Sequence, residues 1–221
     1  MVARRRAERV SCAPWAAALA EPEGTGTVDN GKIGVLIEQH FDETEFRRFN
    51  ELLPQRGYQV EYLSDLWGQG ALTFTGNDGG QQCTVTRDVR DAQTHQYRAL
   101  VLIGGYAMDR LRYQERPQPL VANPAPAIDL LRKAVVAMDS GELRIGAISH
   151  GLWLFCADPD LLRGRTVTCA HSILGDVINA GAEYAFAPGG GGIDTCVDGG
   201  LVTGRDTGVV DAFIDTLVRE I

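Results

Sequence analysis

Short apolar runs alternate with amphipathic stretches along most of this 221-residue chain. The runs at 32–37, 97–103 and 145–148 have the length and composition of buried strands. Between them, the segments 42–53 and 127–140 place apolar side chains at every third or fourth position, as helices do. Strands that alternate with helices predict an α/β fold with a parallel, doubly wound sheet. In such sheets ligands bind beyond the carboxyl ends of the strands.

Smaller elements complete this pattern. Two β-rich runs within 73–86 flank the turn sequence NDGG at 77–80, which predicts a hairpin. Prolines recur toward the end of the segment 106–126, so we expect a long irregular connection there. The other expected elements are strands at 58–63, 166–169, 183–186, 193–197 and 201–203, and helices at 173–180 and 206–220.

The first 31 residues differ in character from the rest of the chain. An arginine-rich start and a short apolar middle loosely resemble a secretory signal. The apolar part is short, however, and Ser11, Cys12 and Pro14 interrupt it. We therefore expect a flexible N-terminal extension over 1–31, followed by a single domain over 32–221.

Composition narrows the class of protein. Hydrophobic residues make up 44% of the chain and charged residues 23%, which is ordinary for a soluble globular domain. The formal net charge of −8 argues against a nucleic-acid partner, because phosphates bind basic surfaces. No run of about 18 apolar residues occurs, so we expect no membrane span. The five cysteines are widely spaced and form no CxxC pair, which predicts reduced thiols and a cytoplasmic protein.

No motif for a cofactor or a metal is visible. The glycine pair at 104–105 does not begin a GxGxxG fingerprint, and the glycines at 189–192 lack the Lys-Ser/Thr pair of a phosphate loop. His40 and Asp42 alone are too few ligands for a metal site. We therefore expect neither a cofactor nor a bound metal.

The junction after the strand at 145–148 is the first candidate for chemistry. The apolar stretch 152–156 follows almost at once, and a strand that turns directly into a helix lifts one side chain out of the bend. That side chain belongs to Ser149, and the helix N-terminus points its free N–H groups to the same place. This predicts a nucleophile elbow, although Ala147 replaces the first glycine of GxSxG. The alternative is an ordinary junction in which the serine caps a helix.

Other groups are expected at the same sheet edge. A serine nucleophile needs an adjacent base, and His150 or His171 could supply one. Glu45 lies in the first turn of the first helix, where a carboxylate either caps the helix or projects over Ser149. The pair at 104–105 lets backbone N–H groups approach a reacting oxygen. Three strand ends thus converge on one point.

Several segments match a known family and occur in the same order as in that family. They lie at 32–46, 99–112, 145–151 and 197–208. They read KIGVLIEQHFDETEF, ALVLIGGYAMDRLR, IGAISHG and VDGGLVTGRDTG. With these segments the chain resembles the ThiJ/PfpI family of the class I glutamine amidotransferase-like superfamily. The resemblance implies a flavodoxin-like three-layer sandwich with a mostly parallel sheet, assembled as a homodimer or a larger homo-oligomer.

The resemblance also implies roles for single residues. The elbow position, a cysteine in the family, is Ser149, and the histidine of the protease-like branch is His150. The glutamate that hydrogen-bonds the nucleophile is Glu45. The N–H of Gly105, with that of His150, forms the oxyanion pocket. Asp109 matches an acidic residue that a neighbouring subunit supplies to orient the histidine.

The remaining pocket residues follow from the same comparison. We expect Gly104 and Gly151 to lie beside the reacting atoms. Tyr106, Trp153 and the proline-rich loop 111–126 are expected to complete the pocket for a small-molecule substrate.

The serine changes which function is expected. Family activities that depend on a thiolate include glyoxalase-type conversion, deglycation and oxidation sensing, and a hydroxyl does not support them in the same way. We expect an enzyme of hydrolase, hydratase or lyase type that acts on a small carbonyl or acyl electrophile through Ser149. Two alternatives stay open. The chain is a Cys-to-Ser variant of a thiol-dependent glyoxalase, deglycase or peptidase, or it is a non-catalytic chaperone or ligand-binding member.

Overall fold

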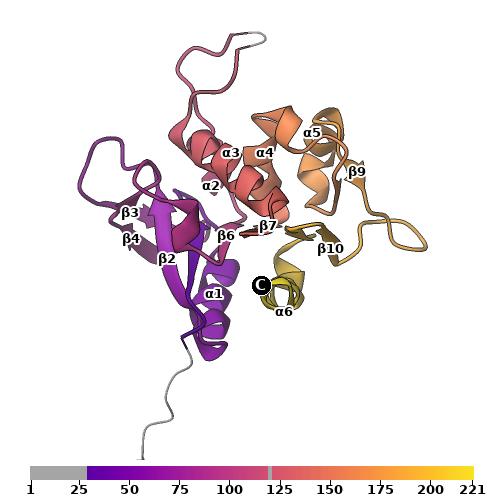
Figure 1. Ribbon diagram of the computed structural model, residues 1–221, viewed down its shortest axis with the longest axis horizontal. Helices are drawn as coiled ribbons and strands as arrows, with labels where there is room; N and C mark the ends of the chain where they lie inside the picture. The colour runs from indigo at the N-terminus through magenta and orange to yellow at the C-terminus, as the bar shows by residue number, and fades with distance from the viewer. Residues whose placement is uncertain (1–28, 119–120) are drawn as a thin grey trace, which may run out of the picture.

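A seven-stranded sheet forms the centre of the computed structural model, which describes residues 29–118 and 121–221 (Figure 1). The strand order is β10-β11-β7-β6-β1-β2-β5, and every neighbouring pair is parallel except β10 and β11. The predicted mostly parallel α/β sheet is therefore confirmed. The strands are β1 (Lys32–Leu36), β2 (Gln59–Ser64), β5 (Arg87–Asp88), β6 (Ala99–Leu102), β7 (Arg144–Ile148), β10 (Thr195–Asp198) and β11 (Leu201–Gly204).

Helices cover both faces of this sheet, which makes the three layers of a flavodoxin-like sandwich. In Figure 1, α1 (Glu43–Gln55) and α6 (Val210–Glu220) lie below the sheet, where they pack against each other. Above it lie α3 (Pro126–Asp139) and two short helices, α2 (Ala107–Leu111) and α4 (Trp153–Cys156), with α5 (Leu174–Asn179) beside α4. No helix within 29–118 or 121–221 is long and apolar enough to cross a membrane.

The central strands are apolar along almost their whole length because helices bury them on both sides. β6 is buried at all of its residues, and β7 at all but the first. On the lower face the ring of Phe213, from α6, is fully buried against β7. A Cβ atom at Gly146 would lie 2.7 Å from Cζ of this ring, so the strand is glycine where the helix approaches most closely.

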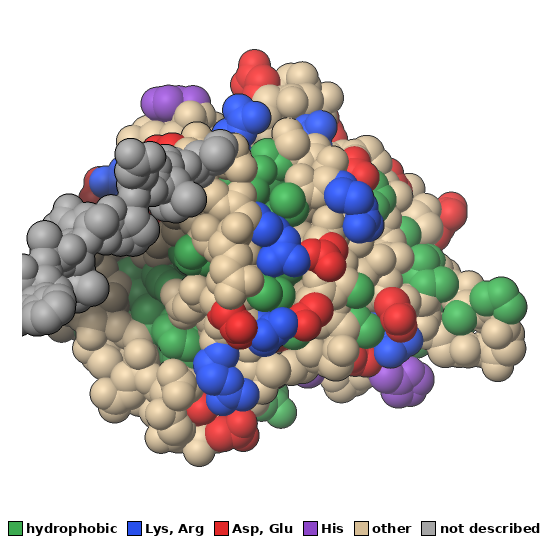
Figure 2. Space-filling model, turned by 90° about the horizontal axis from the view of Figure 1, so that it is seen from below, with side chains coloured by type: hydrophobic (Ala, Val, Ile, Leu, Met, Phe, Trp, Pro, Cys, Tyr) green, Lys and Arg blue, Asp and Glu red, His purple; other side chains and the backbone are tan. Residues whose placement is uncertain are grey.

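Ion pairs join the two helices below the sheet. Arg48 of α1 pairs with Asp211 of α6 at 2.5 Å, and Arg56 pairs with Asp215. The same side of the molecule, seen from below, shows acidic and basic side chains interspersed (Figure 2). Because these pairs are partly exposed, they add little to stability compared with the buried ring.

Two small strand pairs lie outside the central sheet. The predicted hairpin is confirmed, with β3 (Leu72–Thr75) antiparallel to β4 (Gln82–Val85). The short strands β8 (Thr166–Val167) and β9 (Glu183–Tyr184) pair in parallel with each other and not with the central sheet.

Some expectations about local structure were wrong or incomplete. The connection 106–126 is not wholly irregular, since α2 occupies its start, ahead of the first proline. Pro126 begins α3, at the position where its missing N–H has no cost. Strand β5 was not expected, because two residues carry no periodic signal. The expected N-terminal extension lies almost entirely outside the described residues.

Replacing Phe213 with alanine should test the importance of the α6 contact. We expect Phe213→Ala to lower the free energy of unfolding by about 3–5 kcal/mol, because it leaves a cavity under β7. Urea unfolding followed by circular dichroism would measure this. The control is Val136→Ala on α3, where the side chain is 72% exposed and the expected change is within about 0.5 kcal/mol. Equal losses in the two variants would contradict this account of the core.

Candidate active site

The turn after β7 holds Ser149 in an unusual backbone conformation. Its φ is +55°, and among the described residues only two other non-glycines have positive φ. A 3-10 turn (Ser149–Leu152) begins at this residue and leads directly into α4. The side chain is only 7% exposed. Strained backbone of this kind persists where the surrounding structure enforces it, and it is common at functional sites.

A glycine lets this turn lie against the neighbouring strand. A Cβ atom at Gly151 would come within 2.4 Å of the backbone oxygen of Leu102 at the end of β6. No side chain could therefore occupy this position unless the turn moved away from the sheet. Gly151 thus serves the shape of the elbow.

The Ser149 hydroxyl has a basic neighbour. Its Oγ lies 3.1 Å from Nδ1 of His150, so adjacent residues do face each other at this bend. The other ring nitrogen, Nε2, lies 2.9 Å from Oγ of Ser172, in the 3-10 turn His171–Ile173. Ser172 was missed in the sequence, because a serine beside a histidine in a loop has no distinctive pattern.

The histidine ring is enclosed by aromatic side chains. The ring of His150 lies 5.8 Å from that of Tyr106 and 4.9 Å from that of Trp153, measured between centroids. Burial lowers the pKa of His150, and the negative charges of Asp109 and Asp42 oppose this effect. A neutral imidazole at physiological pH can accept a proton.

Glu45 is completely buried behind the elbow. Its Oε2 accepts a hydrogen bond from the N–H of Gly104 at 2.7 Å, and its Oε1 lies 3.1 Å from the hydroxyl of Thr207. Burial raises its pKa well above the ordinary value, and the charge of Asp42 raises it further, against the two hydrogen bonds. Within the described chain, the Ser149 hydroxyl bonds to His150 and not to this carboxyl group.

Gly104 lies between Glu45 and Ser149. A Cβ atom on this glycine would be 2.7 Å from Oε1 of Glu45 and 2.9 Å from Cβ of Ser149. The three strand ends predicted to converge are therefore in contact here, since Glu45 follows β1, Gly104 follows β6 and Ser149 follows β7.

Gly105 provides a free backbone donor at the same place. Its φ is +73°, and an added Cβ atom would lie 2.4 Å from the backbone oxygen of His40. Its N–H makes no hydrogen bond within residues 29–118 and 121–221. The N–H of His150 lies in the first turn after β7, where amides have no intrahelical partner.

Asp109 is exposed on α2 and pairs with Arg112 at 3.2 Å. It does not hydrogen-bond to His150 in this protomer, so its expected role in a neighbouring subunit stays a prediction. His171, the other possible base, is exposed in its 3-10 turn. Trp153 has its Nε1 bonded to Asp176 at 2.9 Å, with the guanidinium of Arg112 5.0 Å from its ring centroid.

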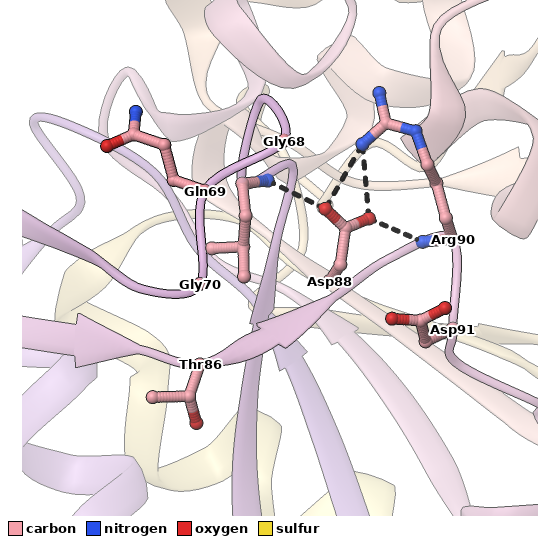
Figure 3. Close-up of a pocket in the computed structure, with 8 residues that line it drawn as sticks. Gly68, Gln69, Gly70, Thr86, Asp88, Arg90 and Asp91 are labelled. Atoms are coloured by element: carbon pink, nitrogen blue, oxygen red, sulfur yellow. Dashed lines mark hydrogen bonds and ion pairs between the residues drawn. The ribbon is translucent and has the colours of Figure 1, made fainter.

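Two hollows lie at the outer end of the same sheet edge and were not predicted. One, of about 570 Å³, lies beside Asp88 and Arg90. Figure 3 shows that the Asp88 carboxylate is already engaged, by the N–H of Leu66 and by Arg90. The other, of about 600 Å³, is lined in part by Trp67, Arg110 and Tyr113. Across the described ranges, no three His, Cys, Asp or Glu side chains are grouped to hold a metal.

Two named proteins are similar to this chain over most of its length. YraA of Bacillus subtilis (strain 168), named as a candidate cysteine protease, is 28% identical over 82% of this chain and 93% of its own length. Protein/nucleic acid deglycase 2 of Escherichia coli (strain K12) is 30% identical over 69% of this chain and 78% of its own.

Solved structures show the same fold. DJ-1beta of Drosophila melanogaster matches 86% of this chain and 89% of its own, with a TM-score of 0.68 and 18% identity. A two-domain protein of Anabaena variabilis, with DJ-1/ThiJ/PfpI-like and ferritin-like domains, matches 86% of this chain with a TM-score of 0.71 and 26% identity. The chain spans only 47% of that protein.

The model of the DJ-1/PfpI family matches residues 31–220, which is nearly the whole chain. The segments that resembled this family in the sequence lie within that match. The chain belongs to the DJ-1/PfpI family.

Proposed function

We propose that this protein is an enzyme that acts on a small carbonyl or acyl electrophile, with Ser149 as its nucleophile. The observation that carries this proposal is the 3.1 Å contact between Oγ of Ser149 and Nδ1 of His150. A serine hydroxyl becomes an effective nucleophile only when a base takes its proton. His150 is such a base, because burial favours its neutral form.

The backbone around Ser149 suits a developing oxyanion. The unengaged N–H of Gly105 and the N–H of His150 are the two candidate donors, and both belong to segments next to Gly104 or Ser149. Donors that are fixed before reaction stabilise negative charge without reorganisation. Gly104 and Gly151 allow the two segments to approach each other closely.

The proposed steps for an acyl substrate use these groups in turn. The oxygen of Ser149 bonds to the carbonyl carbon, the π electrons move to the carbonyl oxygen, and the hydroxyl proton passes to His150. The bond to the leaving group then breaks, and His150 returns the proton to that group. Water repeats the addition and frees Ser149.

Glu45 has a different role from that of His150 in the proposed reaction. Burial raises its pKa and so favours its neutral form, and its oxygens are bonded to Gly104 and Thr207, which makes it a poor base for the first step. We assign it the role of a second proton carrier that also holds Gly104 in place. Asp109, from the same or a neighbouring copy, assists His150 by its charge.

The relatives suggest a second candidate function. Two of them are named as a candidate cysteine protease and as a deglycase. If the serine replaces a cysteine, the pocket should still promote thiol chemistry when the sulfur is restored. A member that only binds ligands would instead retain neither reaction.

A fluorophosphonate probe should distinguish an active serine from a binding site. We expect the probe to form an adduct on the Ser149 peptide, detected by mass spectrometry. Ser149→Ala should abolish the adduct and lower turnover of a true substrate by about 10³-fold or more. Ser140→Ala, at an exposed helix end, serves as the control and should label normally. Absence of an adduct in the unaltered protein would favour the ligand-binding alternative.

Ser149→Cys should report whether the pocket activates a thiol. We expect its new thiol to react with iodoacetamide at pH about 6 roughly tenfold faster than that of Ser140→Cys, because a helix N-terminus favours a thiolate. Burial raises the pKa of Cys83 to about 11 and those of Cys156 and Cys169 to about 12, so these thiols add little background. Peptide mapping would separate the signal from that of other cysteines. Equal rates in the two variants would count against retained thiol chemistry.

Glu45→Gln should test whether Glu45 is neutral in the folded protein. The folded state keeps a proton on Glu45 that the unfolded chain releases above about pH 4.5, so stability falls as pH rises from there. Glutamine can make the same hydrogen bonds and cannot ionise. The free energy of unfolding of the variant, relative to the unaltered protein, should therefore increase with pH by at most about 1.4 kcal/mol per unit.

Urea unfolding between about pH 4.5 and 7.5 would measure this slope. The exposed Glu142→Gln variant is the matched control and should show no such trend. A difference for Glu45→Gln that does not vary with pH would show that Glu45 is ionised when folded.

A further inference from the structure

Both ring nitrogens of His150 have a hydroxyl within hydrogen-bond distance. Nδ1 lies 3.1 Å from Oγ of Ser149, and Nε2 lies 2.9 Å from Oγ of Ser172. The ring therefore joins two serines that are 23 positions apart in the sequence.

We propose that Ser172 positions His150, so that Ser149, His150 and Ser172 form one hydrogen-bonded chain within a single protomer. This inference rests on the proposed function of Ser149 as the nucleophile. Ser172 is thus a positioning residue and does not itself touch the substrate.

The first argument concerns which nitrogen carries the proton. A neutral imidazole has one N–H donor and one acceptor nitrogen. To accept the proton of Ser149, Nδ1 must be the acceptor, and the proton must then be on Nε2. Oγ of Ser172 lies 2.9 Å from Nε2 and has lone pairs that can accept a hydrogen bond from Nε2–H. In the proposed chain Ser172 accepts from Nε2–H, which leaves Nδ1 as the nitrogen that can act as a base.

The second argument concerns how Ser172 is held. The backbone N–H of Ala170 donates to the backbone oxygen of Ser149 at 3.3 Å, and the N–H of Ile173 donates to the oxygen of Ala170 at 3.1 Å. The side chain of Ile173 is fully buried and fixes the turn to the core. The turn that carries Ser172 is thus tied to the backbone of Ser149.

The third argument concerns the freedom of the ring. Tyr106 and Trp153 flank His150, so its ring has limited room to turn. The charged groups that act on it are Asp109 and Asp42, which do so through space without a hydrogen bond to it. A direct contact at Nε2 comes only from Ser172 among the described residues. A neutral hydroxyl there orients the ring without adding a charge.

Nitrogen NMR on protein labelled at histidine nitrogen would test this without any substrate. The chain has only four histidines, so His150 can be assigned by a His150→Asn variant. We expect the unaltered protein to show a protonated Nε2 and an unprotonated Nδ1 at neutral pH. Ser172→Ala should shift His150 toward a mixture of tautomers, and Ser172→Thr should restore the original signals.

The same variants should change the reaction of Ser149 with the fluorophosphonate probe. We expect Ser172→Ala to lower the maximal rate of labelling about three- to tenfold, with little change in probe affinity. Ser172→Asp should raise the pKa of His150 by about one unit or more, because a carboxylate would face Nε2. Ser140→Ala is the control for both measurements.

Unchanged nitrogen signals of His150 in Ser172→Ala would overturn the proposal, whatever happens to labelling. Because the NMR readout needs no reaction, it still tests Ser172 if Ser149 proves not to be a nucleophile. The failure of this inference and the failure of the proposed function are therefore distinguishable.

Discussion

The packing of three strand ends around Gly104 is the constraint on which the site depends. The carboxyl group of Glu45 touches this glycine from one side, and Cβ of Ser149 approaches it from the other. Any side chain at this position would separate β1 from β7 at their carboxyl ends. The apolar strands and the helices on both faces bring the carboxyl ends of the strands together. Because Gly104 has no Cβ, the residues at these ends can come into contact.

Much of this arrangement could be predicted from the sequence, because it depends on periodic patterns. Apolar runs at 32–37, 97–103 and 145–148 become β1, β6 and β7 with small changes at their ends. The abrupt junction at Ser149 predicted a sharp turn, and its positive φ agrees with that expectation. The first helical turn placed Glu45 near this sheet edge but left open whether it caps the helix, and only the family resemblance assigned it to the site.

Other features could not be predicted, because they depend on tertiary contacts. Nothing in the sequence placed Ser172 beside His150, since hydrogen bonds between loops leave no periodic signal. The contact between the side chains of Ser149 and His150 could not be predicted either, because neighbouring side chains on a regular helix point apart. The strained bend removes that objection. Strand β5 forms because it pairs with β2. Its two residues alone carry no sequence signal that predicts this pairing.

The three glycines of the site have a consequence for how this protein could be altered. At Gly104, Gly105 and Gly151 the atom nearest to an added Cβ lies between 2.4 and 2.7 Å away, and at Gly105 and Gly151 it is a backbone atom. A library of variants at these positions would return almost only glycine. If the protein is the proposed enzyme, changes in its substrate range would therefore arise at the rim, where Tyr106 is 54% exposed and the described residues 112–118 and 121–125 after α2 form no helix or strand. In such an enzyme, the glycines around Ser149 would stay constant in evolution while the residues at the rim change.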